Sequence, residues 1–300
     1  MEITSKMVAD LRAETGVGMM ECKKALVEAQ GDFEAAKTVL RKKGLAAAAG
    51  KAGRTASEGL VVAHVGVKGA VLVEVNCETD FVARTEGFRD FAGKLAERIA
   101  AHDAFNDTRS GDPAEAAKLS WPGGETVQDA VLHLVATLKE NIQVRRFARW
   151  TARPSESFAS YVHGNGRIGV VVGLPGGDDA LGKDLAMHIA ASDPRFAGRA
   201  EVTPEILEAE REIARAQAAA SGKPANVIDR IVEGKVEKFY QETVLTEQAF
   251  VKDPDKTVGQ VIVERGGKTA LELRFVRYKL GESLGRPASP DAAALAEQRS

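Results

Sequence analysis

The sequence predicts an α+β protein made of several unequal parts, and three observations support this prediction. The first 44 residues carry apolar side chains at helical spacing throughout. Two later segments, which begin near residues 58 and 161, each show a β-hairpin pattern followed by a helix. From residue 203 the chain is helical on both sides of a turn signal. We therefore expect a three-helix bundle, then a core of two related α+β subdomains with an inserted antiparallel helical hairpin.

Three short helices are predicted in residues 1–44, and they share a thin core. Thr4 or Ser5 caps the first helix, Asp32 caps the third, and Gly44 ends the third. The turn between the first two helices, with the sequence GVGMM, is too apolar for a plain solvent loop. After the bundle, a stretch rich in Ala, Gly and Lys predicts a partly helical basic linker.

The two subdomains are related by an internal repeat. Each begins with a β-hairpin signal and continues into a helix. The helical segments KLAERIAAHD at 94–103 and DLAMHIAASD at 184–193 coincide at six of ten positions. An amphipathic helix at 125–140 and a strand at 142–151 are predicted between them.

The helical hairpin is predicted from a cap and a turn. Thr203 caps its first helix, Pro204 occupies the first helical position, and Gly222-Lys223-Pro224 turns the chain back. A short helix and a strand between residues 258 and 278 then close the second subdomain. The predicted units are the bundle (1–44), the linker (45–57), the first subdomain (58–141), the second subdomain (142–202 and 243–280), the hairpin (203–242) and a flexible tail with a short helix (281–300).

Composition and charge limit the classes of function. The 300 residues include 41 Lys and Arg against 43 Asp and Glu, for a formal net charge of −2. A whole-chain electrostatic nucleic-acid binder needs a basic surplus, so no direct nucleic-acid contact is expected. Cys22 and Cys77 are too few for a disulfide framework and predict reduced thiols. No apolar run approaches the ~18 residues of a membrane span, and no signal peptide is recognised. We expect a soluble, cytoplasmic protein without membrane contact.

Two glycine motifs suggest nucleotide binding, but their context opposes that interpretation. GNGRIG at 164–169 matches the dinucleotide pattern, yet its last glycine opens a strand where the motif requires a helix. GDDALGK at 177–183 matches GxxxxGK, but Asp184 follows instead of Ser or Thr, and two aspartates repel phosphate. The five histidines have no metal-ligand spacing, and no catalytic set can be assigned. We therefore expect no cofactor, no metal site and no enzymatic activity of its own.

A strand rich in arginine allows an RNA-binding alternative. Basic and aromatic side chains interleave there: Arg145, Arg146, Phe147, Arg149, Trp150 and Arg153. Such interleaving occurs at single-stranded nucleic-acid sites. An amphipathic strand with one charged face explains the pattern at least as well.

One further segment is not explained by the glycine motifs or by the arginine-rich strand. EVNCETDFVAR at 74–84 leaves strand alternation near Asn76, so Thr79–Val82 should lie on the connection to the next helix. Asp80 and Phe81 could be presented together at this edge. In the alternative interpretation Thr79 caps a turn, Asp80 supports it and Phe81 belongs to the core. The residues alone favour this alternative.

The same segment carries a resemblance to a known family. EVNCETDFVAR at 74–84 resembles the second signature of the elongation factor Ts family, and LRAETGVGMMECKKAL at 11–26 resembles the first. Further similar segments are HG at 163–164, MHIAAS at 187–192, SGKP at 221–224 and KTVGQ at 256–260. The resemblance extends to about residue 280, with departures in the irregular stretch 102–124 and in the Pro-containing tail.

The resemblance implies a guanine-nucleotide exchange factor for elongation factor Tu. The first three helices would form a ubiquitin-associated-like domain that docks on the partner's GTPase domain. The residues at the positions of the family's docking motif are Leu11, Arg12, Met19 and Met20. Such docking would explain why the GVGMM turn is apolar.

The resemblance also implies roles for the core and the hairpin. Thr79, Asp80, Phe81 and Val82 would intrude beside the magnesium site of the partner, and His163 with the second subdomain would face another domain of that partner. The helical hairpin would serve assembly, as a homodimer or a two-plus-two complex.

Two other classes stay open at this stage. A pure adaptor with a ubiquitin-associated-like module would bind a partner without changing nucleotide release. An RNA-binding translation factor would show a steep salt dependence of RNA affinity.

Overall fold

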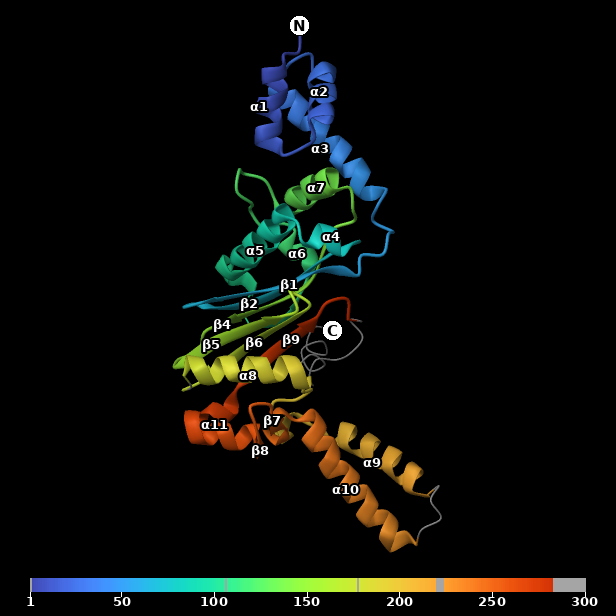
Figure 1. Ribbon diagram of the computed structural model, residues 1–300, viewed down its shortest axis with the longest axis vertical. Coiled ribbons are helices and arrows are strands. Elements are labelled where there is room, and N and C mark those ends of the chain that lie inside the picture. The colour runs from blue at the N-terminus through green and yellow to red at the C-terminus, as the bar shows by residue number, and fades with distance from the viewer. Residues whose placement is uncertain (1, 106, 177, 220–223, 283–300) are drawn as a thin grey trace.

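The computed structural model describes residues 2–105, 107–176, 178–219 and 224–282. The molecule is elongated, with a helical bundle at one end and a helical hairpin at the other (Figure 1). Between them lie two antiparallel sheets, stacked and covered by helices on their outer faces. This arrangement confirms the predicted α+β class.

The bundle consists of α1 (Ser5–Thr15), α2 (Met19–Glu28) and α3 (Phe33–Ala49). The predicted caps are present: the Thr4 hydroxyl accepts from the amide of Met7, and the Asp32 carboxylate accepts from that of Ala35. Gly16 ends α1 in the left-handed conformation. The small core holds Val8, Leu11, Val17, Cys22, Ala25, Leu26, Ala36 and Leu40.

Helix α3 passes through Gly44, where the sequence predicts its end. Gly44 is buried against α7 (Val127–Leu138), and a Cβ there would lie 3.7 Å from the carbonyl oxygen of Leu132. Gly44 thus lies inside the contact between the two helices, and Arg41 of α3 adds an ion pair to Asp129 of α7 at 2.8 Å. The helix continues past Gly44 to Ala49, so the first residues of the predicted linker are helical.

The first sheet has the order β1-β2-β4-β3. Its strands are β1 (Glu58–Gly66), β2 (Gly69–Cys77), β3 (Thr108–Gly111) and β4 (Gln143–Thr151). The sequence places the 142–151 strand in the second subdomain, but β4 pairs antiparallel with β2 in the first. Strand alternation identifies a strand but not its partner, so this boundary moves to the end of β4.

Helices cover the outer face of the first sheet. They are α4 (Asp80–Ala83), α5 (Glu86–Ala101), α6 (Pro113–Ala116) and α7. The stretch 102–124, predicted irregular, contributes β3 and α6 to this layer. Valines of β2 meet Phe88 and Leu95 of α5 and Val131 of α7 in the largest core of the molecule.

The second sheet has the order β5-β6-β9. Its strands are β5 (Glu156–His163), β6 (Ile168–Pro175) and β9 (Arg274–Lys279). Helix α8 (Asp179–Ser192) covers the outer face, so the predicted repeat of a hairpin followed by a helix is confirmed. Beyond α8 lie β7 (Ala249–Phe250), β8 (Asp253–Thr257) and α11 (Val258–Gly266). Short 3-10 helices occupy Asp103–Phe105, Arg199–Glu201, Leu245–Glu247 and Lys268–Glu272.

The two sheets pack face to face through a second apolar core. Leu72 and Trp150 of the first sheet meet Val171 of the second there, and all three are buried. Arginines with largely buried side chains flank this core at both ends. Arg146 bonds Glu74 at 2.7 Å and lies 4.1 Å from the ring centre of Tyr278.

At the opposite end, Arg274 donates two hydrogen bonds to Glu156, each 2.8 Å long, and one to Asp107. Arg274 also donates to the Thr151 carbonyl of the first sheet at 2.8 Å, so it joins the two sheets directly. Charges buried this deeply are tolerated only when paired. The two arginine clusters therefore fix how the sheets sit on one another.

The helical hairpin is formed by α9 (Pro204–Ala219) and α10 (Ala225–Thr243). The Thr203 hydroxyl accepts from the Ile206 amide at 3.4 Å, as predicted for a cap. The predicted turn at Gly222-Lys223 and residues 283–300 of the predicted tail lie outside the described residues. The two helices contact each other and project away from the sheets (Figure 1).

A buried histidine anchors the base of the hairpin. The amide of Val251 donates to Nδ1 of His188 at 3.3 Å, so Nε2 carries the proton and donates to the side-chain oxygen of Gln248 at 2.9 Å. The amide nitrogen of Gln248 donates to the Glu242 carbonyl, at the end of α10, at 2.8 Å. Burial lowers the pKa of His188 below its usual 6.5, because it disfavours the charged ring.

Prediction on sheet packing: we expect Gly169→Ala to lower the unfolding free energy by about 1–3 kcal/mol, because overpacked cores are destabilised. The new Cβ would lie 2.4 Å from Cγ1 of Val61 in the facing sheet. Gly234→Ala on exposed α10 meets no atom within 4 Å and should be neutral or stabilising by up to about 1 kcal/mol. Urea unfolding of both variants measures the difference. Equal effects would contradict the close packing at Gly169.

Prediction on pH: the chain should lose stability as the pH falls below about 6.5, because the unfolded state takes up the His188 proton first. The stability that neutral His188 contributes is fully present above that pH, and it is lost as the pH falls toward the lower pKa that His188 has in the folded state. His188→Gln cannot titrate, so its loss of stability between pH 7.5 and 5.5 should be smaller. Urea midpoints at both pH values measure this. Parallel losses in the two proteins would contradict the role of His188.

Candidate functional site

The two glycine motifs are structural. Gly164 and Gly166 adopt φ of +61° and +94° in the β5–β6 turn, and β6 follows instead of a helix. In the second motif, the Asp178 carboxylate accepts from the Leu181 amide at 2.5 Å and caps α8. A carboxylate thus occupies the helix N-terminus that a phosphate would need. In the described residues, the first motif leads into a strand and the second has its helix N-terminus capped by Asp178, which does not fit nucleotide binding.

The arginines of β4 are engaged inside the protein. Arg146 bonds the buried Glu74, Arg145 donates to the Glu282 carbonyl at 2.6 Å, and the 3% exposed Arg149 donates to the Ala100 carbonyl at 3.3 Å. The aromatic residues between them belong to the cores. Arg153, beyond the end of β4, is exposed, but the other three arginines form no free basic surface, which weakens the RNA-binding alternative.

The segment after β2 forms a single turn of helix, α4. The Thr79 hydroxyl accepts from the Val82 amide at 3.4 Å, which confirms the predicted cap. Val82 and Ala83 face the core below. Phe81 points outward and is 79% exposed, so the interpretation that it belongs to the core is wrong. A large aromatic side chain this exposed is unusual.

The neighbours of Phe81 are polar on the outside and apolar beneath. Asp80 pairs with Arg84 at 2.7 Å on the surface of the same turn. Cys77 is buried below and donates its thiol hydrogen to the Thr79 carbonyl at 3.1 Å. Burial raises the pKa of the Cys77 thiol to about 12, with a smaller contribution from the negative charge of Glu140. The predicted reduced thiols are confirmed, since both cysteines are free and buried.

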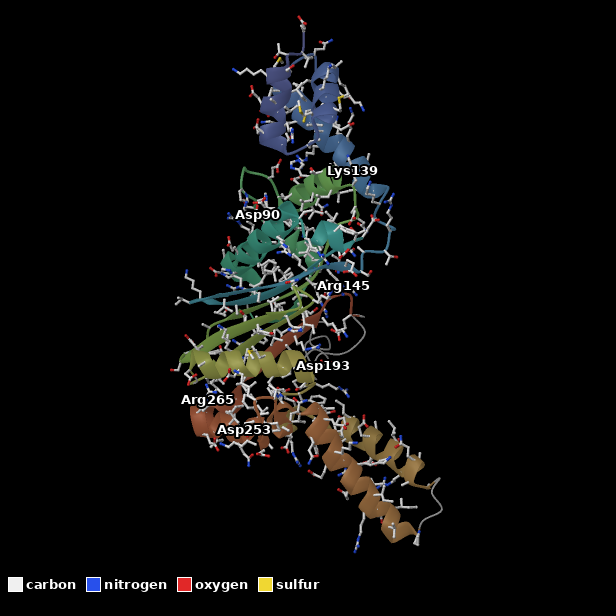
Figure 2. All side chains as sticks on the ribbon, viewed as in Figure 1. Asp90, Lys139, Arg145, Asp193, Asp253 and Arg265 are labelled. Carbon is white, nitrogen blue, oxygen red and sulfur yellow. The ribbon has the colours of Figure 1, made fainter. Side chains whose placement is uncertain are left out.

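Glu140 is a residue of this site that sequence reasoning missed. Its carboxylate accepts the backbone amides of Glu78 and Thr79, each at 3.0 Å. Glu140 follows Lys139, which ends α7 on the bundle side of the first sheet (Figure 2). Nothing in the sequence connects positions so far apart along the chain.

The bundle presents an apolar surface around the start of α2. Met19 is 46% exposed and Met20 66% exposed, and Arg12 on α1 is also exposed. Val27, two turns further along α2, is 58% exposed and was not predicted. The sequence could have indicated Val27, because a spacing of seven residues places it on the same helix face as Met20. Leu11 is fully buried in the bundle core, so it supports this surface from below without being part of it.

His163 ends β5 and is exposed, with Nδ1 3.1 Å from the Tyr161 hydroxyl. The adjoining turn meets β1, because the Val61 amide donates to the Gly166 carbonyl at 2.8 Å. Glu58 of β1 pairs with Cys77 in the sheet and forms an ion pair with Arg167. The sheet packing therefore brings His163 and the α4 segment to the same end of the core.

Comparisons with known proteins agree with one another. Residues 78–282 match the family model described as elongation factor TS. A relative named elongation factor Ts from Nitrosospira multiformis is 49% identical over 300 residues, covering 99% of this chain and 96% of its own length. The elongation factors Ts of Thioalkalivibrio sulfidiphilus and Rhodospirillum rubrum are each 48% identical, covering 95% and 99% of this chain and 94% and 98% of their own lengths.

These matches define the class of protein as a translation elongation factor with a nucleotide-exchange role, and the fold is consistent with it. More particularly, the chain belongs to the elongation factor Ts family.

Proposed function

We propose that the chain binds GDP-bound elongation factor Tu in the cytoplasm and promotes release of GDP by disturbing the magnesium and phosphate site. The observation that carries this proposal is Phe81, 79% exposed beside Asp80 on a one-turn helix at the end of the first sheet. No described helix is both long enough and apolar enough to cross a membrane.

The proposed mechanism needs no catalytic group and no cofactor in this chain. The factor must bind the nucleotide-free partner more tightly than the GDP-bound partner. By linkage, GDP and the factor then weaken each other's binding by the same ratio. GTP can rebind once GDP has left, which returns the partner to the elongation cycle.

Magnitudes decide how much the Phe81 side chain can contribute. A thousandfold acceleration corresponds to about 4 kcal/mol, at about 1.4 kcal/mol for each factor of ten. Burying one phenylalanine on the partner contributes about 1.5–3 kcal/mol. Phe81 is therefore insufficient alone, and loss of magnesium coordination would supply the remainder, because the ion neutralises the phosphate charges.

The remaining surfaces would hold the segment in place. Arg12, Met19, Met20 and Val27 form the proposed docking surface of the bundle, which we take to be the ubiquitin-associated-like domain. His163 would contact a second domain of the partner from the same end of the core as Phe81. The α9–α10 hairpin projects away from the sheets, and we assign to it the assembly role in a homodimer or two-plus-two complex (Figure 1).

Prediction on the exchange segment: Asp80→Ala with Phe81→Ala should slow stimulated GDP release by about tenfold to a hundredfold, the loss expected from unburying one phenylalanine. The thermal midpoint should change little, because Phe81 makes no core contact in the free chain. Stopped-flow release of a fluorescent GDP measures the rate. Val67→Ala, which alters a residue 99% exposed at the far tip of the β1–β2 hairpin, is the control. An unchanged rate in the double variant would remove the segment from the mechanism.

Prediction on the docking surface: Met19→Ser with Met20→Ser should weaken binding to elongation factor Tu by about tenfold or more, as expected for apolar interface anchors. The release rate at saturating factor should stay near the wild-type value, because the exchange segment is intact. Titration of the release rate separates the two quantities. Val263→Ser on α11 is the control, since that valine is similarly exposed. If the double variant binds like the wild type, the docking role is wrong.

A further inference from the structure

The α4 segment needs support from outside itself. A helix of four residues cannot be stable alone, because nucleation costs more than its few hydrogen bonds return. Phe81 points away from the protein, and the side chain of Asp80 bonds Arg84 of the same turn. Val82 and Ala83 pack into the core and hold the end of the turn. Asp80 and Phe81 lie between them and Thr79, so their orientation also depends on what holds the start of α4.

Glu140 provides that support through three hydrogen bonds. Its Oε2 accepts the amides of Glu78 and Thr79 at 3.0 Å each, and its Oε1 accepts the Thr79 hydroxyl at 2.5 Å. Lys139 adopts a left-handed conformation, with φ of +63°, so α7 ends there and Glu140 leaves the helix axis. Hydrogen bonds to a charged carboxylate are the stronger kind.

The connection is reciprocal. Glu78 Oε1 accepts the amide of Asn141, the residue after Glu140, at 2.7 Å. The Asn141 side chain in turn donates to the Arg54 carbonyl at 2.8 Å. Two loops more than sixty residues apart in sequence are thus joined in both directions, because a carboxylate of each loop accepts a backbone amide of the other. The contact joins the start of α4 to the end of α7.

We propose that Glu140 is a positioning residue for nucleotide exchange: its carboxylate holds Thr79 as the cap of α4 and thereby sets where Asp80 and Phe81 stand. The inference rests on the proposed function of that segment. The Thr79 hydroxyl oxygen that accepts from the Val82 amide is the one whose hydrogen is donated to Glu140, so the carboxylate orients the group that caps α4. Among the described residues, every hydrogen bond of the Glu140 side chain goes to residues 78 and 79.

The test is Glu140→Gln, which keeps the side-chain size but replaces a charged acceptor with an amide group. Release of fluorescent GDP from elongation factor Tu is measured against factor concentration. We expect the saturating rate to fall about tenfold, equal to about 1.4 kcal/mol, while the half-saturating concentration stays within about twofold. A residue that only stabilised the fold would not separate the two quantities.

The matched control is Glu201→Gln. Glu201 also accepts a backbone amide, that of Ala197 at 2.8 Å, but lies in the second subdomain away from α4. Its release curve should match the wild type. Thr79→Val tests the contact from the other side and should lower the saturating rate in the same direction. This second variant keeps the inference testable if Glu140→Gln does not fold.

A local readout checks the positioning without any partner. Cys77 donates to the Thr79 carbonyl, so loosening of the segment should raise the alkylation rate of Cys77 in Thr79→Val, which keeps the Glu140 charge beside the thiol. Cys22 is buried in the bundle and serves as the internal reference in the same sample. We expect Cys77 alkylation to rise several-fold while the Cys22 rate stays constant. Equal rates in variant and wild type would overturn the inference.

A double variant tests whether Glu140 acts through Phe81. In the Phe81→Ala background, Glu140→Gln should have little further effect, because coupled residues are not additive. If both changes multiply, Glu140 acts by another route and the inference fails. If Phe81→Ala slows release but Glu140→Gln does not, the inference fails alone. If the wild type does not accelerate GDP release at all, the proposed function fails, and the inference fails with it.

Discussion

The face-to-face packing of two sheets determines where every proposed contact lies. Leu72 and Val171 meet across this interface, and Gly169 lets the backbones approach closely. At one end Arg146, paired with the buried Glu74 of its own sheet, donates to the Lys279 carbonyl of the second sheet at 3.1 Å and so links the two sheets. A shift between the sheets would separate Phe81 from His163, which sit on different subdomains. The proposed partner contacts thus depend on the core between the two sheets, although the contacting residues themselves lie on the surface.

Much of the fold follows from the sequence, because its local signals are strong. The caps at Thr4 and Asp32 and both β-hairpins form where their residues predict them. The failures concern partners distant along the chain. Local pattern could not show that β4 joins β2, or that Gly44 packs on α7 instead of ending a helix.

In the candidate site, too, local sequence signals predicted one part and contacts between distant residues determined the rest. Its location was predicted from the segment at 74–84, whereas the exposure of Phe81, the burial of Leu11 and the support by Glu140 depend on tertiary contacts. In the proposed mechanism the bundle supplies affinity, and the α4 turn supplies the difference in affinity between nucleotide states. Only that difference can accelerate release, because uniform binding would leave the affinity for GDP unchanged.

The most direct measurement of this claim is a thermodynamic cycle by titration calorimetry. The affinity of the chain for elongation factor Tu is measured without nucleotide and with saturating GDP, and the affinity of GDP is measured with and without the chain. The account predicts that GDP weakens binding of the chain, and that the chain weakens binding of GDP by the same factor. An affinity for the partner that is unaffected by GDP would contradict the account and identify the chain as an adaptor.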